Sequence, residues 1–337
     1  GALVRLSLEI ANRELIIKKL VSMLYDKGSG GEEQAAAALA NLASDSADNR
    51  NSIVDAGGIP PLLSLLEMAS PKARENAISA ISQLAHHKQI RSAIAKAGGI
   101  PMLANALAAT SSSGGGGGAG GAGGAGKDAT NSASAANALS SLSAFAIAQL
   151  SRGHRSNQLA LTEAGAIPPL VAMLGSPSSE MQANAANALA ALSRHNADNQ
   201  HAVARTGAIA PLCSLVREGA PNVKEQSAAA IWSLAADNAP NKATVAKLGG
   251  IEPLIGLLVG ADTPASLEHS VGALGALASK HADNCEAIAR MIVGKLSSRM
   301  AMSSGNGAVR VLLAVAQLCK GCAQNQLAIA KAGGIPP

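Results

Sequence analysis

The stretch Ala228-Ala-Ala-Ile-Trp-Ser-Leu-Ala235 decides the fold of this chain, together with the polar turn and the segment Leu248-Gly-Gly-Ile251-Glu-Pro-Leu254 that follow it. The first part predicts a helix, because alanine has the highest intrinsic helix propensity. The two glycines favour the end of a second, short helix, since a helix C-terminus commonly needs a residue with positive φ. The Ile-x-Pro-Leu motif then predicts the start of another helix, where proline is tolerated in the first turn.

This pattern recurs with a spacing of about 42 residues. The Gly-Gly-Ile or Gly-Ala-Ile motif lies at Ile59, Ile100, Ile167, Ile209, Ile251 and Ile335. Three of the intervals are 41, 42 and 42 residues, and the last interval is 84, which is twice 42. A degraded copy is therefore expected near residue 293, where Met291-Ile-Val293-Gly-Lys-Leu296 lacks the Gly-Gly pair and the proline. A single copy would expose its apolar faces, so neighbouring copies must stack into a solenoid.

One copy carries an insertion. The interval from Ile100 to Ile167 is 67 residues, which is 42 plus 25. The extra segment, at about 111–128, consists almost entirely of glycine, serine and alanine, cannot bury apolar area and predicts a flexible loop. It contains Gly121-x-Gly123-x-x-Gly126, the letter pattern of a dinucleotide-binding loop. A run this rich in glycine produces such matches by composition, so we expect no cofactor there.

Each repeat predicts three helices, which we name by their place in the motif. The opening helix starts at the isoleucine, the long helix ends at a recurring leucine, and the short helix ends at the glycine pair. The recurring leucines are Leu42, Leu84, Leu150, Leu192, Leu234, Leu277 and Leu318. An asparagine lies ten residues before the isoleucine at Asn49, Asn157, Asn199, Asn241 and Asn325, and Asn284 has the same place in the degraded copy. We expect this asparagine to cap the short helix.

The order Ile-Pro-x-Leu-x-x-Leu-Leu, then Ala-x-x-Ala-Leu/Ile-x-x-Leu-Ala, then Asn, then Ala-Gly-Gly/Ala-Ile resembles the armadillo repeat family. The resemblance covers essentially the whole chain. It implies an all-α fold, a right-handed α-solenoid of about seven three-helix repeats. Residues 1–16 would be the end of a preceding repeat or a capping helix. The repeats are expected at 17–58, 59–99, 100–166, 167–208, 209–250, 251–292 and 293–334, with an eighth starting at 335.

The composition argues against catalysis, a metal centre and nucleic-acid binding. The formal net charge of +5 is mild for 337 residues, and the basic residues are scattered. No Ser/His/Asp, HExxH or paired-carboxylate pattern occurs, so we expect no enzyme. Cys319-Lys-Gly-Cys322 is a single CxxC motif, whereas a structural zinc site needs four ligands. We expect Cys319 to be a packed thiol, with a metal or redox role as the alternative.

Four scattered cysteines are too few for a disulfide framework and favour an intracellular setting. Among intracellular sites the cytoplasm is preferred, with the nucleus and the cilium left open. No apolar run is long enough to span a bilayer, so we expect no direct membrane insertion.

In armadillo arrays the long helices line a concave groove, and the resemblance places the residue before each recurring leucine in it. These residues are Asn41, Gln83, Gln149, Ala191, Ser233, Ala276 and Gln317. Amides can hold an extended peptide, although exposed amides are also common on helices that bind nothing. Trp232, beside this row, is either a binding hot spot or a packed residue between two repeats. Phe145 lies one turn before Gln149 and shares the groove.

The residues around the groove bear on what it could bind. Glutamates lie eight residues before the groove row at Glu33, Glu75, Glu225 and Glu268. They could form an acidic lane for a basic peptide, but we favour an interaction with the helix macrodipole. Importin-α grooves carry a tryptophan one turn before each groove asparagine, and most of those slots here hold small or polar residues. A nuclear-import receptor is therefore not expected, and the groove also lacks the dense basic lining of β-catenin.

Three functions fit this sequence. The first is a non-enzymatic scaffold that binds a peptide or protein surface in the groove. The second is the substrate-recruiting region of a larger ubiquitin ligase, as in plant-type U-box ligases with armadillo arrays. The third is a structural subunit of a large cytoskeletal, ciliary or membrane-tethered assembly. The sequence predicts a protein or peptide partner in each case and does not identify it.

Overall fold

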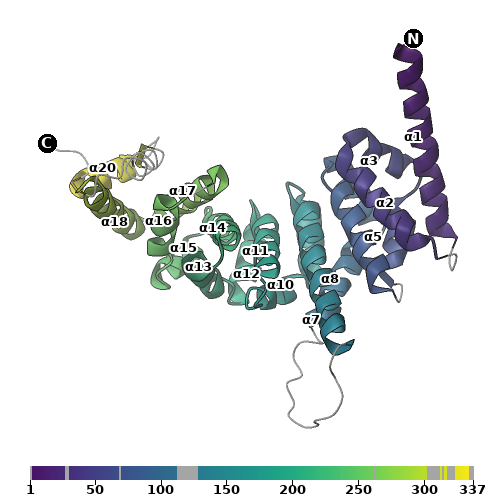
Figure 1. The fold of residues 1–337 in the computed structure, drawn as a ribbon. Coiled ribbons are helices and arrows are strands. Elements are labelled where there is room, and N and C mark those ends of the chain that lie inside the picture. The colour runs from purple at the N-terminus through teal and green to yellow at the C-terminus, as the bar shows by residue number, and fades with distance from the viewer. Residues whose placement is uncertain are drawn as a thin grey trace, which may run out of the picture. The chain divides into compact units, whose positions relative to one another are not determined.

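The chain folds as an all-α solenoid (Figure 1). The computed structural model describes residues 2–26, 30–67, 70–111, 128–261, 263–301, 312, 315–316 and 323–333, and no strand occurs among them. The chain divides into two compact units, Gly1–Pro169 and Leu170–Pro337, and each unit is described by itself.

The first unit contains three long helices, each followed by a short helix. Its helices are α1 (Ala2–Tyr25), α2 (Glu32–Asp45), α3 (Ala47–Asp55), α4 (Ile59–Ser64) with the 3-10 turn Leu65–Glu67, α5 (Pro71–Leu84), α6 (Lys88–Lys96), α7 (Gly99–Ser111), α8 (Asp128–Ser151) and α9 (Arg155–Glu163). The long helices are α2, α5 and α8, and α5 packs between the other two. Helix α10 (Ile167–Met173) begins at the end of this unit.

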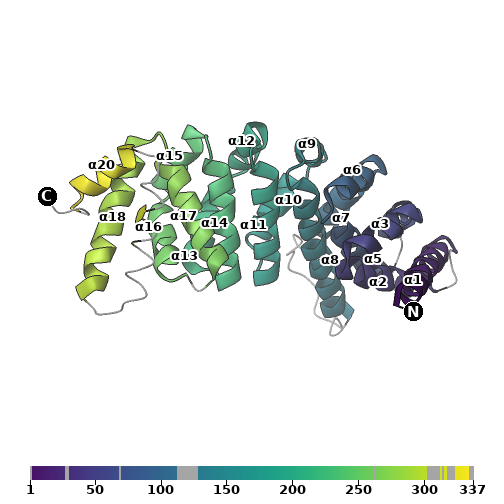
Figure 2. The same cartoon turned by 90° about the horizontal axis from the view of Figure 1, so that it is seen from above.

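The second unit repeats the same order. Its helices are α11 (Ser179–Ser193), α12 (Ala197–Arg205), α13 (Ile209–Glu218), α14 (Pro221–Ala235), α15 (Ala239–Lys247), α16 (Ile251–Val259), α17 (Pro264–Ala278), α18 (Ala282–Ala301) and α20 (Ala323–Lys331). The long helices α11, α14 and α17 stand side by side, with α14 in the middle (Figure 2). Alanine at many of their contact positions allows this close approach.

The recurring motif residues take the predicted positions. Opening helices α13 and α16 begin at Ile209 and Ile251. The first glycine of the pair before α16, Gly249, has a φ of 71°, as expected for a helix C-terminus. The second, Gly250, is small for another reason: an added Cβ would lie 2.7 Å from Val245 Cγ1 and 2.8 Å from Cys213 Sγ.

The degraded copy has a direct structural consequence. Helix α18 runs without a break through the place where other repeats end a short helix and start an opening helix. Without the Gly-Gly pair and the proline, nothing stops the helix there. Residues 112–127 of the predicted insertion at about 111–128, together with Gln317, Leu318 and the CxxC motif, lie outside the described residues.

The recurring leucines form the centre of the core. Leu84, Leu150, Leu192, Leu234 and Leu277 are all 0% exposed. Leu42 differs from them, because its side chain is half-buried. No helix in the described part of the chain is long and apolar enough to cross a membrane.

The recurring asparagine does not cap the short helix, so this prediction was wrong. The N-cap lies three residues earlier: the Asn238 side chain accepts from the backbone N–H of Asn241 at 3.1 Å. The Asn241 side chain instead donates from Nδ2 to the carbonyl of Leu234, at the end of the long helix, at 2.9 Å. The same donation occurs from Asn49 to Leu42, Asn157 to Leu150, Asn199 to Leu192 and Asn284 to Leu277, at 2.8 to 3.1 Å. A helix leaves its last carbonyls without intrahelical donors, and this amide supplies one.

Replacing Asn241 by alanine should therefore lower stability by about 1–3 kcal/mol, because the buried Leu234 carbonyl loses its side-chain donor. Thermal and urea unfolding followed by circular dichroism would measure the change. Asn222→Ala, at an exposed position in the first turn of α14, is the matched control and should have little effect. Equal unfolding midpoints for the two variants would contradict this role of Asn241.

Candidate functional site

The candidate surface is the exposed side of the long helices, which we call the long-helix face and treat separately in each unit. In the first unit Asn41 is exposed, Gln83 and Phe145 are half-buried, and Gln149 is only 3% exposed. Gln149 therefore offers little area for contact with a partner. Gln317 lies outside the described residues.

Phe145 contacts the preceding repeat. Its ring lies 6.4 Å from the ring of His86, centroid to centroid, and is tilted by 50°. His86 is exposed and follows the end of α5, whereas Phe145 lies on α8. The sequence predicted Phe145 in the groove, and its pairing with His86 was missed.

Trp232 contacts both neighbouring repeats of the second unit. The guanidinium carbon of Arg194, at the C-terminal end of α11, lies 5.5 Å from the centroid of the Trp232 ring. His269 of α17 lies 6.4 Å from Trp232 between ring centroids, with a tilt of 53°. Gly272 of α17 makes room for the ring, since an added Cβ would lie 2.5 Å from Trp232 Cδ2. The tryptophan is packed between two repeats and is still half-buried rather than buried.

The sequence contained a partial signal for this cluster. A glycine inside a helical pattern often marks close approach of another group, and Gly272 stands in the middle of α17. Arg194 gave no such signal, because it lies two residues beyond Leu192, after the apolar pattern ends.

Gly272→Ala should destabilise the second unit, although alanine is the better helix former by up to about 1 kcal/mol. The added methyl group would overlap the indole, and overpacking of this kind costs about 1–3 kcal/mol. Thermal unfolding would give the stability change. The emission of Trp232, the one tryptophan in the sequence, would report displacement of the ring.

Gly256→Ala is the matched control. Gly256 lies inside α16, and an added Cβ there would meet no atom within 4 Å. This variant should be as stable as the parent or more stable. A Gly272→Ala variant that gained as much stability as Gly256→Ala would contradict the packing of Trp232 against α17.

A small recess lies beside Trp232 in the second unit. A recess of about 60 Å³ is lined by Arg194, His195, Trp232, Ser233 and Ala236. Ser233, the groove-row residue of α14, is only 4% exposed. The neighbouring side chains, rather than Ser233 itself, therefore form most of the accessible surface here.

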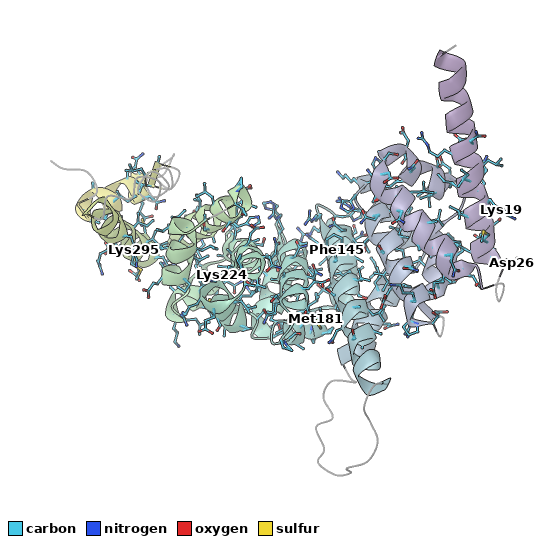
Figure 3. All side chains as sticks on the ribbon, viewed as in Figure 1. Lys19, Asp26, Phe145, Met181, Lys224 and Lys295 are labelled. Carbon is cyan, nitrogen blue, oxygen red and sulfur yellow. The ribbon has the colours of Figure 1, made fainter. Side chains whose placement is uncertain are left out.

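A cavity of about 750 Å³ lies against the first turns of α14 and α17 and against α13, α16 and α18. It is lined by the cations Arg217, Lys224 and Lys295 and by the carboxylates Glu225 and Glu252. Lys224 and Lys295 are labelled in Figure 3. Its mixed charges select no single class of ligand.

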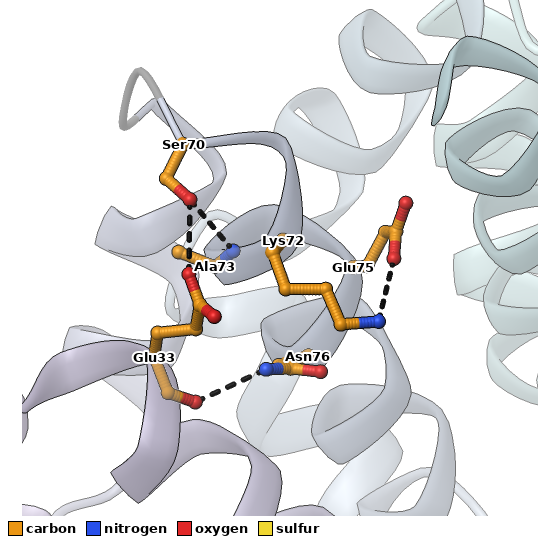
Figure 4. A network of polar contacts seen from close by, with 6 residues as sticks. All are labelled: Glu33, Ser70, Lys72, Ala73, Glu75 and Asn76. Carbon is orange, nitrogen blue, oxygen red and sulfur yellow. Dashed lines mark hydrogen bonds and ion pairs between the residues drawn. The ribbon is translucent and has the colours of Figure 1, made fainter. Parts of the chain in front are cut away.

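Glu33 and Glu225, two of the four glutamates that precede the groove row, link neighbouring repeats. Glu33 Oε2 accepts from the hydroxyl of Ser70, the N-cap of the next long helix, at 3.1 Å (Figure 4). The Glu33 carbonyl also accepts from Asn76 Nδ2 at 3.1 Å. Glu75 forms an ion pair with Lys72 at 3.1 Å, within its own helix.

The same link recurs in the second unit. Glu225 Oε2 accepts from the hydroxyl of Thr263, the N-cap of α17, at 2.7 Å. Its backbone carbonyl lies 3.2 Å from His269 Nδ1. Ala183 holds the corresponding position of α11, and the next N-cap, Ala220, has no hydroxyl. Glu33 and Glu225 thus each accept from the N-cap hydroxyl of the next long helix.

The residue after the recurring asparagine ties the short helix to the next repeat. Gln200 Nε2 donates to the carbonyls of Ser233 and Ala236 at 2.9 and 3.1 Å. Lys242 Nζ donates to the carbonyl of Ser279 in the following repeat. Burial lowers the pKa of Lys242, with a smaller lowering from Lys280 and an opposing rise from Asp237.

In the first unit Arg91, which follows Ile90 at the position of the recurring asparagine, donates to the carbonyl of Arg152 in the next repeat. Burial lowers the pKa of Arg91, and the charge of Arg152 lowers it further. These side chains hold the C-terminal ends of the long helices, which border the long-helix face.

Lys242→Gln should stabilise the chain, because Gln200 binds the corresponding carbonyls without burying a charge. A gain of about 1 kcal/mol would raise the thermal midpoint by roughly 2–4 °C. The lowered pKa means that the folded state binds fewer protons than the unfolded state just below pH 10.5, so parental stability rises with pH there. The advantage of the variant should therefore shrink as the pH approaches 10.5, and an advantage that grew with pH would contradict the assignment.

The cysteines of the described chain are packed groups. Cys213 and Cys285 form no disulfide and are buried. Burial raises the pKa of the Cys213 thiol to about 11, against a smaller lowering by Arg217, so it is not a ready nucleophile at neutral pH. Among the described residues no group of three or more histidine, cysteine and carboxylate side chains lies close enough to hold a metal ion.

Comparisons with known proteins identify the repeat. Residues 46–86, 154–194 and 196–236 match the family model of the armadillo/β-catenin-like repeat. The chain therefore contains armadillo/β-catenin-like repeats at these three places. No match is found among curated proteins.

Solved structures give armadillo neighbours of this protein. An engineered protein from a structural genomics consortium is 26% identical, with a TM-score of 0.65 over 79% of this chain and 99% of that chain. A designed armadillo repeat protein is 24% identical, with a TM-score of 0.64 over 77% and 99% of the two chains. A further designed armadillo repeat protein, in complex with the peptide (KR)4, is 22% identical, with a TM-score of 0.62 over 77% and 99%. The last two show likeness of fold alone.

Proposed function

We propose that this armadillo-repeat protein is a non-enzymatic scaffold that binds an extended peptide or a protein surface on its long-helix face. Armadillo repeats in general serve as protein-interaction scaffolds. The described residues supply no metal-binding cluster, and their cysteines are buried. The structurally similar designed protein in complex with a peptide supports peptide binding by this fold.

The observation that carries the proposal is the half-buried Trp232 on α14, packed between Arg194 of one repeat and Gly272 of the next. Aromatic and arginine side chains are enriched among residues that dominate the energy of binding. Packing on both sides keeps the indole in one orientation, so little rotamer freedom is lost when a partner binds. Asn187 of α11 is half-buried on the adjacent long helix and extends the polar part of this face.

The test is selection of a random twelve-residue peptide library on the immobilised chain, followed by affinity measurement for the enriched peptides. Ala276→Arg places a large side chain on the half-buried row of α17, and should weaken their binding at least ten-fold. Ala243→Arg makes the same change at an exposed position of the short helix α15, and should leave binding unchanged.

Melting curves of both variants would show that each is folded. Peptides that bind both variants as well as the parent would place the binding surface elsewhere on the molecule. Failure to enrich any peptide above the bare support would contradict peptide binding itself.

A further inference from the structure

The short helix α9 is capped by a titratable side chain. His154 Nδ1 accepts from the backbone N–H of Asn157 at 3.4 Å, and Nε2 lies 2.8 Å from the hydroxyl oxygen of Ser92 on α6. A neutral imidazole has one acceptor nitrogen and one N–H group, so the acceptor role of Nδ1 places the proton on Nε2, which donates to Ser92. The ring thus joins the start of α9 to the preceding repeat, and it does so in its neutral form.

The corresponding caps of other short helices do not change charge near neutral pH. Ser46, Asn196 and Asn238 accept through side-chain oxygens at 3.1, 3.2 and 3.1 Å. Each of them lies three residues before the recurring asparagine, as His154 does. The same position therefore accepts a hydroxyl or an amide, and histidine adds a response to protons.

The charged groups around His154 in the first unit are mostly basic. Two of them flank it in the sequence and three lie on α6: Arg152, Arg155, Lys88, Arg91 and Lys96. The acidic residue of α9, Glu163, lies at the far end of that helix, and α7, which also packs against α9, has no charged residue. Burial and the charge of Arg152 lower the pKa of Arg91, so cations already lie close together here. A proton on His154 would add positive charge at a helix N-terminus, where the macrodipole disfavours it.

A second histidine cap, in the second unit, has different neighbours. His281 Nδ1 accepts from the backbone N–H of Asn284 at 3.4 Å. Lys280 precedes it, whereas Asp283 and Glu286 follow it in α18. Because carboxylates lie near it in the sequence, a proton on His281 would meet less repulsion than a proton on His154.

Protonation of His154 would remove one bond from a junction of three helices. The Nδ1 atom of an imidazolium carries a proton and cannot accept from Asn157. Asn157 is only 2% exposed, and its side chain donates to the carbonyls of Leu150 at 3.0 Å and of Arg91 at 3.5 Å. Loss of the cap would therefore loosen the residue that binds both the end of α8 and the preceding repeat.

We propose that His154 is a pH-sensitive cap, which holds the first turn of α9 at neutral pH and releases it when the imidazole is protonated. The unfolded turn accepts the same proton without losing a bond, so the stability of this turn falls as the pH is lowered. Helix α8 carries Phe145 and ends at this junction, so acid would also loosen the end of that long helix. This regulation goes beyond the scaffold function and does not depend on where a partner binds.

The test is amide hydrogen exchange of the full chain, resolved by residue, from about pH 8 to about pH 5, the range over which histidine changes its charge. Each rate is divided into the intrinsic rate at the same pH, which leaves the protection due to structure. The protection of the Asn157 N–H should fall about five-fold across this range, as expected for the loss of an N-cap. In His154→Asn it should change little, because asparagine is the cap of α12 and α15.

His201→Asn is the matched control. His201 is exposed on α12, and its Nδ1 lies 2.8 Å from the carbonyl oxygen of Ala197, so this nitrogen donates in both charge states. This variant should show the same fall at Asn157 as the parent. The ring nitrogen resonances of His154 in the parent give a second measurement that needs no variant. At the upper end of the pH range they should show the proton on Nε2.

Three results would overturn the proposal. Constant protection of the Asn157 N–H in the parent would show that protonation leaves the cap intact. An equal fall in the parent and in His154→Asn would assign the pH dependence to another group. A neutral His154 ring with its proton on Nδ1 would show that this nitrogen does not accept from Asn157. Circular dichroism of each variant checks that the fold is intact.

Discussion

The hydrogen bond from the recurring asparagine to the recurring leucine underlies each described repeat that contains both. Two consecutive helices meet at this junction, and the last carbonyls of the long helix have no intrahelical donor. The amide of Asn199 or Asn241 supplies that donor from the following short helix, seven residues along the chain. These asparagines are 1–3% exposed, so water cannot readily replace the bond. The bond fixes the angle between the two helices, and with it the direction in which the next residue points.

That next residue connects one repeat to the following one. Gln200 and Lys242 reach the C-terminal carbonyls of the long helix in the next repeat. At the opposite end of the long helices, Glu225 holds the N-cap hydroxyl of Thr263. Polar contacts therefore hold α17 near both ends, from α14 at its N-terminus and from α15 at its C-terminus, while alanine and leucine pack the middle of α14 against α17. Because both ends are held, side chains on the long-helix face keep a defined spacing from one repeat to the next.

The spacing of the motifs was sufficient to predict the helices. It did not predict which side chains bind to which groups where two helices meet. Apolar periodicity and the Gly-Gly-Ile motif reflect local rules, so the starts of α13 and α16 followed from sequence. Asn241 lies within reach of two helix ends, and sequence spacing cannot distinguish a cap on the short helix from a donor to the long helix. Glu225 was attributed to its own helix dipole, because its partner Thr263 lies 38 residues away in the sequence and approaches only when repeats stack. For the same reason the sequence marked Trp232 as unusual without revealing Arg194.

Packing and recognition are not competing explanations for Trp232. A fully buried indole could not touch a partner, and a fully exposed one would lose rotamer freedom on binding. Gly272 allows the ring to lie against α17, and Arg194 lies near it from α11, yet part of the side chain stays exposed. In the first unit Phe145 and His86 hold an aromatic contact between the corresponding parts of neighbouring repeats, where His86 stands two residues after Leu84 as Arg194 stands two residues after Leu192. The position after the long helix thus supplies the group that meets the aromatic ring of the next repeat. Where that group is Arg194, the residue that contacts the ring also lines a small recess beside it.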